Sequence, residues 1–231
     1  MLTVPQFLPD RLAAVTARIA AAAGRAGRDP AEVRLLAVSK QQPAEMVRAA
    51  AAAGQREFGE NYVQEAIPKI DSLRDLPLTW HFIGQLQANK TRDVAAACQW
   101  VHTVDRPRIA ERLSAQRPHY AGPLDVLLQV KVSGKAGKGG VAPESVADLA
   151  AVVTGLPRLR LRGLMCMPEP AAGEMAQREP FRRLRELHDD LRRQGHALDT
   201  LSMGMSDDLE AAVLEGATIV RVGTAVFGPR N

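Results

Sequence analysis

Eight short apolar runs, each followed by a segment with a helical pattern, constrain the fold of this chain more than any other feature. Continuous apolar runs between helices are typical of parallel strands, which are buried on both faces of their sheet. Eight such units in one chain favour a closed (β/α)8 barrel, with a doubly wound open sheet as the alternative. The runs are residues 33–39, 57–59, 78–83, 100–104, 124–130, 159–165, 198–203 and 219–222.

An amphipathic segment precedes the first run. Between residues 6 and 27, Leu8, Leu12, Val15 and Ile19 recur at helical spacing. This pattern predicts an extra N-terminal helix that packs against the barrel. Because no low-complexity linker divides the chain, residues 1–231 are expected to form a single domain.

Composition excludes several classes of protein. The net charge of +4 comes from scattered arginines, and aromatic residues make up only 4% of the 231 residues, so a nucleic-acid groove is not expected. Cys98 and Cys166 are far apart, which argues against a disulfide framework or a structural zinc site and favours a reducing compartment. We find no secretion signal and no run long enough to span a membrane, so a cytoplasmic protein is expected.

Lys40 ends the first apolar run and is one of only six lysines in the chain. In a barrel, the end of a strand is where functional residues collect. A partly desolvated amine there has a lowered pKa and can condense with an aldehyde. Lys131 also follows an apolar run and is the internal rival of Lys40, although Val132 continues the alternation and suggests that Lys131 points outward.

Two loops near the C-terminus predict an anion site. Ser206 begins an expected helix at 206–214 as its N-cap, and Asp207 and Asp208 follow it. Plain helix capping would explain these residues equally well. However, barrels often bind phosphate with the loops after strands seven and eight, and Gly223-Thr224 lies in the second of these loops.

Arg221 lies inside the last apolar run, where a charge must be paired or must contact a ligand. It is either a partner of a buried carboxylate or a guanidinium that faces an aromatic ring nitrogen. His81 is interpreted as a core or site-lining residue, and Glu60 as either a general base or a helix cap. The glycine–lysine loop at 134–140 fails the Walker pattern and is interpreted as a mobile basic loop.

Several segments together resemble one family, the pyridoxal phosphate homeostasis proteins. The resemblance runs over essentially the whole chain. The segments that carry it are Ala37-Val38-Ser39-Lys40, Phe58-Gly59-Glu60-Asn61-Tyr62, Trp80-His81-Phe82-Ile83-Gly84-Gln85-Leu86-Gln87-Ala88-Asn89-Lys90, Ser202-Met203-Gly204-Met205-Ser206-Asp207-Asp208 and Val220-Arg221-Val222-Gly223-Thr224.

The resemblance implies a single barrel related to the N-terminal domain of alanine racemase, the fold-type III architecture of pyridoxal phosphate proteins. It implies a pyridoxal 5'-phosphate held as an aldimine on Lys40, with Arg221 facing the pyridine nitrogen. Asn61 and His81 would line the ring. The phosphate would contact Ser206, Gly223 and Thr224, with Met203, Gly204 and Met205 beside it.

The leading hypothesis is therefore a protein that holds this cofactor and acts in its homeostasis, with little catalysis of its own. It is expected to be a monomer that meets cofactor-free enzymes transiently. A low-activity amino-acid racemase is the alternative, disfavoured because related racemases take a catalytic base from a second domain that this chain is not expected to have. A barrel with a structural lysine and another phosphorylated ligand is the third possibility.

Overall fold

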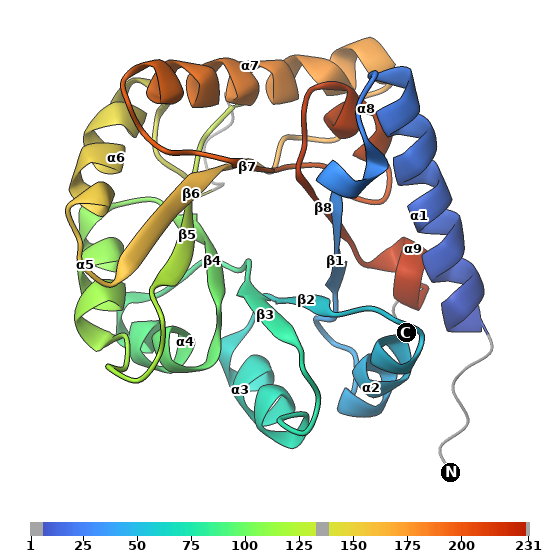
Figure 1. Cartoon of the computed structure of the whole chain (residues 1–231), viewed down its shortest axis with the longest axis horizontal. Helices are drawn as coiled ribbons and strands as arrows, with labels where there is room; N and C mark the ends of the chain where they lie inside the picture. The colour runs from blue at the N-terminus through green and yellow to red at the C-terminus, as the bar shows by residue number, and fades with distance from the viewer. Residues whose placement is uncertain (1–6, 133–138, 230–231) are drawn as a thin grey trace.

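The strands of the chain form a closed ring. The computed structural model describes residues 7–132 and 139–229, and there eight parallel strands pair in chain order, with the last pairing back to the first (Figure 1). The predicted barrel is confirmed, and the open-sheet alternative is wrong. The strands are β1 (Arg34–Val38), β2 (Glu57–Glu60), β3 (Thr79–Phe82), β4 (Trp100–Val104), β5 (Leu124–Gln129), β6 (Leu159–Met165), β7 (Thr200–Ser202) and β8 (Ile219–Val222).

Helices surround this ring on its outer side, as Figure 1 shows. Short 3-10 turns lie at Pro30–Glu32 (η1), Ala88–Lys90 (η2) and Pro143–Ser145 (η3). The α-helices are α1 (Phe7–Arg25), α2 (Ala44–Ala52), α3 (Val63–Ser72), α4 (Thr91–Ala97), α5 (Pro107–Gln116), α6 (Val146–Thr154), α7 (Glu174–Arg193), α8 (Leu209–Leu214) and α9 (Thr224–Phe227).

The first helix is the predicted extra element. Its apolar stripe buries Leu8, Leu12, Val15 and Ile19, and it packs beside α8 and α9. Arg18 adds an ion pair to Glu210 on α8, with its Nε 2.6 Å from Oε1. Because α8 and α9 flank the loops after β7 and β8, α1 supports the part of the barrel where the anion site is predicted.

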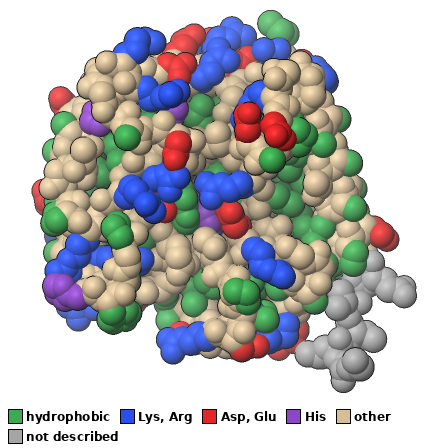
Figure 2. All heavy atoms as spheres, viewed as in Figure 1, with side chains coloured by type: hydrophobic (Ala, Val, Ile, Leu, Met, Phe, Trp, Pro, Cys, Tyr) green, Lys and Arg blue, Asp and Glu red, His purple; other side chains and the backbone are tan. Residues whose placement is uncertain are grey.

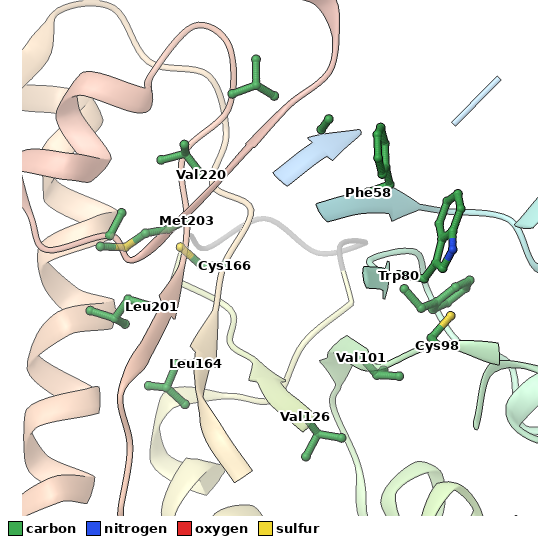
Figure 3. Close-up of a cluster of buried hydrophobic side chains, with 14 of the residues drawn as sticks. Phe58, Trp80, Cys98, Val101, Val126, Leu164, Cys166, Leu201, Met203 and Val220 are labelled. Carbon is green, nitrogen blue, oxygen red and sulfur yellow. The ribbon is translucent and has the colours of Figure 1, made fainter. Parts of the chain in front are cut away.

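The strands bury side chains on both faces. Outward-pointing residues meet the helices in the main core, part of which Figure 3 shows with Val101, Leu164 and Val220 on three different strands. Inward-pointing residues alternate with them and form two separate small clusters inside the ring, as expected for a period of two along each strand. These inner clusters are Leu36, Ile83 and Ile219, and Trp100, Leu127 and Met165.

Helix α7 begins earlier than the sequence pattern indicates. The pattern predicts a helix at 181–193, whereas the helix starts at Glu174 and contains Pro180. Proline removes one backbone hydrogen bond inside a helix. Here the face that buries Phe181, Leu184 and Leu191 holds the helix against the barrel despite that loss.

Both cysteines are free and buried. Burial raises the pKa of each thiol to about 12, so both are protonated near neutral pH. In residues 7–132 and 139–229, no helix has the length and hydropathy needed to cross a membrane. Within the same ranges, no group of His, Cys, Asp and Glu side chains could hold a metal ion.

Candidate functional site

A cavity of about 190 Å³ lies at the carboxyl ends of the strands. Segments that are distant in the sequence meet there, namely the end of β1 and the loops after β2, β7 and β8. This is the face on which barrels of this kind bind ligands. The lining residues are Val38, Lys40, Asn61, Ile83, Met167, Met205, Ser206, Asp207, Arg221, Gly223 and Thr224.

The cavity brings together most of the side chains that the sequence singled out. Among the predicted site residues, His81, Met203 and Gly204 do not line it. Met203 is buried in the outer core. Gly204 lies in the turn after β7 with φ of 92°, and an added Cβ would stand 2.5 Å from the Cβ of Ala212, so only glycine fits there.

Lys40 follows β1 and is partly buried. The next residue, Gln41, has a φ of 61°, which is unusual for a residue other than glycine. Such a conformation persists only where the surroundings hold it. Here the backbone N–H of Gln41 donates to the carboxylate of Glu65. The backbone on the C-terminal side of Lys40 is thus fixed from α3.

A buried charged group, which we call the Lys69 cluster, holds the other side of Lys40. It consists of Lys69, Glu60, Glu65 and Ser39. Lys69 Nζ lies 2.8 Å from the carbonyl oxygen of Ser39, 2.7 Å from Glu60 Oε1 and 2.8 Å from Glu65 Oε1. The Ser39 hydroxyl also donates to Glu60 Oε1, at 2.7 Å. The cluster therefore contacts the chain immediately before and after Lys40.

The position of Glu60 differs from both sequence interpretations. Glu60 is the last residue of β2, and α3 begins only at Val63, so Glu60 does not cap this helix. It does not line the cavity, because its side chain turns outward to Lys69. Burial raises the pKa of Glu60, and the hydrogen bonds from Lys69 and Ser39 oppose that rise. Its role is structural support for the strand ends.

Arg221 is buried, with only 3% of its surface exposed. Its Nη1 donates to Ser202 Oγ and its Nη2 to the carbonyl oxygen of Cys166, both at 2.8 Å. The alternative of an ion pair with a barrel carboxylate is not found among the described residues. Burial lowers the pKa of Arg221. Arg221 is thus a cation at the cavity wall, oriented by neutral partners.

The loops after β7 and β8 contact each other. Helix α8 begins at Leu209 and not at Ser206, so Ser206 is not its cap. Ser206 lies instead in a turn, and its Oγ accepts a hydrogen bond from the backbone N–H of Ala225 at 3.4 Å. Thr224 begins the short helix α9, which the sequence analysis did not predict. Two loops joined in this way beside a short extra helix are the common phosphate site of such barrels.

Of the two residues predicted to line the ring, Asn61 lines the cavity and His81 does not. Asn61 lines the cavity, and its Oδ1 is a buried oxygen without a hydrogen-bond partner in the described residues. His81 is completely buried inside the ring, and its Nδ1 lies 2.9 Å from Nε2 of His102. Sequence reasoning missed His102, although Trp100-Val101-His102 alternates and places the histidine on the same face as Trp100.

These two buried histidines predict that acid destabilises the fold. Burial lowers the pKa of His81, and burial, His81 and Arg221 lower the pKa of His102 well below 6.5. The unfolded chain binds a proton at each histidine as the pH falls through about 6.5, whereas the folded chain does not. The free energy of unfolding should therefore fall as the pH drops below about 6.5, by at most about 1.4 kcal/mol per pH unit for each histidine that stays neutral in the folded chain.

Urea unfolding at about pH 7.5 and about pH 5.5 measures this loss. His119→Gln, a substitution of an exposed histidine, is the control variant. His102→Asn should reduce it, and the part that remains should come from His81 and His188, whose pKa values burial also lowers. If His102→Asn and His119→Gln showed the same pH dependence, the buried His102 would not be a source of the loss of stability in acid.

Two larger hollows lie outside this cavity. One, of about 440 Å³, shares Asn61 with it and is lined further by Gln85, Gln87 and Lys90. The other, of about 560 Å³, includes Arg160 and Arg162 at the opposite end of β6. Neither combines an amine, a buried guanidinium and hydroxyls. Lys131 is exposed beyond β5, and the predicted mobile loop falls largely on residues 133–138, outside the described residues.

Comparison with protein families gives a match over nearly the full length. The family described as alanine racemase, N-terminal domain, matches residues 11–231. A relative from Pseudomonas aeruginosa, called pyridoxal phosphate homeostasis protein, is 61% identical over 224 residues, or 97% of this chain and 96% of the relative. A relative of the same name from Escherichia coli is 50% identical, with 97% of each chain covered.

Solved structures agree with this match. PipY of Synechococcus elongatus with PLP bound is 39% identical and superposes with a TM-score of 0.83, covering 96% of this chain and all of that one. Alanine racemase from Corynebacterium glutamicum has a TM-score of 0.67 at 16% identity, over 96% of this chain and 61% of the racemase. The second likeness concerns the fold alone.

Proposed function

The chain belongs to the pyridoxal phosphate homeostasis protein family, and from this premise we propose that it binds pyridoxal 5'-phosphate in the 190 Å³ cavity and acts in the homeostasis of that cofactor. The observation that carries the proposal is the convergence of three kinds of group on this one cavity. They are the amine of Lys40, the buried guanidinium of Arg221 and the hydroxyls of Ser206 and Thr224.

The residues present fit the cofactor. An aldehyde needs an amine, a phosphate needs hydroxyl and N–H donors, and a pyridine nitrogen needs a donor. The cavity supplies each of these. In addition, the buried Asn61 Oδ1 has no partner in the described residues and offers an acceptor to a hydroxyl of the ring.

Each residue then has a proposed role. Lys40 would bind the aldehyde carbon covalently. Ser206 and Thr224 would bind the phosphate, with Gly223 allowing the backbone to approach it. Arg221 would face the ring nitrogen. His81 does not line the cavity, so it would act only through the buried side chains that it contacts. Met203 and Gly204 would shape the turn after β7.

Arg221 also explains why holding is favoured over catalysis. When bound, the cofactor supplies an aldehyde and an electron-withdrawing ring, which withdraws most strongly when its nitrogen is protonated. Arginine has only N–H donors and does not give up its proton near neutral pH. It therefore leaves the ring nitrogen an acceptor, and the ring a weak electron sink.

The proposal has a wider scope as well. Residues 1–231 would form one cofactor-binding domain, because β1 to β8 close a single ring. The protein would act as a monomer in the cytoplasm and deliver the cofactor to cofactor-free enzymes in transient encounters. The two buried free thiols support a reducing compartment.

Equilibrium dialysis followed by borohydride reduction tests the proposal. We expect retention of about one pyridoxal 5'-phosphate per chain, a pyridoxyl adduct on Lys40 in the mass spectrum, and much weaker retention of pyridoxal, which lacks the phosphate. A coupled assay for conversion of L-alanine to D-alanine should show no turnover. Retention of another phosphorylated compound without any adduct would overturn the proposal.

A further inference from the structure

A chain of polar side chains crosses the inside of the barrel. His81 Nε2 lies 3.3 Å from Glu57 Oε2, and His81 Nδ1 lies 2.9 Å from His102 Nε2. His102 Nδ1 lies 2.9 Å from Ser202 Oγ, which accepts from Arg221 Nη1 at 2.8 Å. These five residues come from β2, β3, β4, β7 and β8, and we call them the axial chain.

The two ends of the axial chain lie at opposite ends of the barrel. Arg221 lines the cavity at the carboxyl ends of the strands, whereas Glu57 begins β2. His81, His102 and Ser202 are completely buried, while the side chain of Glu57 is 21% exposed. The axial chain thus connects the cavity wall to a carboxylate that solvent can reach.

Charged residues close the barrel around Glu57. Arg34 Nη1 lies 3.4 Å from Glu57 Oε1, and the guanidinium groups of Arg34 and Arg162 lie 4.9 and 5.0 Å from the ring centre of Trp100. Trp100 in turn stacks on His81, with 5.4 Å between the ring centres. Arg162 also pairs with Asp125 and Asp199. Figure 2 shows basic, acidic and histidine side chains gathered at the middle of the ring in this view.

The two ends of the axial chain favour one arrangement of its hydrogens. Arginine can only donate, so Ser202 Oγ accepts from Arg221. Glu57 Oε2 lies 3.3 Å from His81 Nε2, outside the geometry of a regular hydrogen bond, but as a carboxylate it can only accept and therefore favours a hydrogen on that nitrogen. If His81 is neutral, its Nδ1 accepts from Nε2 of His102. The Nδ1 of His102 then accepts from the Ser202 hydroxyl, and every donor points away from Arg221 toward Glu57.

Electrostatics agree with this assignment. Burial alone would raise the pKa of Glu57, but the neighbouring His81 and Arg34 side chains outweigh it and lower that pKa. Burial lowers the pKa of both histidines. Near neutral pH the acid is therefore ionised and the two imidazoles are neutral.

We propose that Glu57 is a positioning residue for Arg221, because it fixes the tautomers of His81 and His102 and thereby the hydroxyl of Ser202. The role of Arg221 toward the cofactor rests on the proposed function, but the direction of the axial chain does not. Without the carboxylate, the hydrogen of His81 would move from Nε2 to Nδ1. The hydrogen of His102 would then move from its own Nε2 to its own Nδ1. The Ser202 hydroxyl would then accept from both His102 and Arg221, and its own hydrogen would lose His102 as its acceptor, which would change the hydrogen bonding around Arg221.

Long-range ¹H–¹⁵N NMR of the cofactor-free protein tests the proposal, because it reads the tautomer of each histidine directly. In the wild type we expect both His81 and His102 as neutral Nε2–H forms. Glu57→Leu should convert both to Nδ1–H and shift the side-chain signals of Arg221. Glu57→Gln keeps an acceptor oxygen and should retain the wild-type tautomers.

Two matched variants serve as controls. Asp199→Leu removes another carboxylate of the same barrel end, and Arg34→Met removes the other partner of Glu57, and both should keep the Nε2–H forms. A protonated His81 in the wild type, or unchanged His102 and Arg221 signals in Glu57→Leu, would overturn the proposal. In protein loaded with pyridoxal 5'-phosphate, Glu57→Leu should also shift the absorption maximum. If the protein did not bind the cofactor, only this absorption measurement would fail. Failure of the proposed function is therefore distinguishable from failure of the role proposed for Glu57.

Discussion

Lys40→Ala is expected to abolish covalent attachment of pyridoxal 5'-phosphate and to leave the barrel folded. Lys40 lies after β1 and lines the cavity, so its loss removes the amine without opening the core. The phosphate and ring contacts proposed for Ser206, Thr224 and Arg221 remain. We therefore expect residual, reversible binding, no visible absorption band from a lysine adduct and no pyridoxyl mass after borohydride reduction.

Two controls make this result specific to Lys40. Lys40→Arg keeps a positive charge but not a nucleophilic amine, so it should behave like Lys40→Ala. Lys131→Ala removes the other lysine that follows an apolar strand, and its exposed side chain predicts a normal adduct yield. Adduct formation in Lys40→Ala, or its loss in Lys131→Ala, would show that Lys40 is not the residue that forms the adduct.

The sequence predicts the barrel well because its signals are local. Parallel strands inside a barrel are apolar on both faces, so each leaves a short apolar run bounded by helical segments. The end of each apolar run predicts where the strand ends. Lys40, Asn61, Ser206 and Thr224 could therefore be assigned to one face before any contact was known, and the cavity brings all four together.

What the sequence did not indicate depends on partners far along the chain. Lys69 lies in α3 and resembles an exposed lysine, but its buried partners are Ser39, which follows β1, and Glu60, which ends β2. His102 meets Ser202 across the barrel, 100 residues later. No periodic pattern carries such pairings, because a polar residue that is paired in the interior has the same local spacing as an exposed one.

The two polar networks support the site from different sides. The Lys69 cluster lies outside the ring and fixes the backbone on both sides of Lys40. The axial chain lies inside the ring and orients Arg221. Because the two networks have no residue in common, a substitution in one should leave the other intact, and their effects on cofactor binding should be additive.

Lys69→Met should lower the free energy of unfolding by about 3–5 kcal/mol, because it leaves a buried carboxylate without its cation. The side chains of Glu60 and Lys69 are only 1% and 5% exposed. Glu65 would add repulsion, since its own carboxylate would also lose Lys69. With the contact to Ser39 gone, the chain around Lys40 should loosen and the adduct should form more slowly. Urea unfolding and the rate of borohydride-trapped adduct measure the two effects.

The double variant Lys69→Met with Glu60→Gln separates charge from packing. Removing both charges leaves neutral groups of similar size, so most of the lost stability should return, as it does when a buried ion pair is replaced as a unit. Arg48→Met is the matched control, because it breaks an exposed pair with Asp75 and should change stability little. If Lys69→Met were no more destabilising than Arg48→Met, the Lys69 cluster could not be what holds the backbone at Lys40.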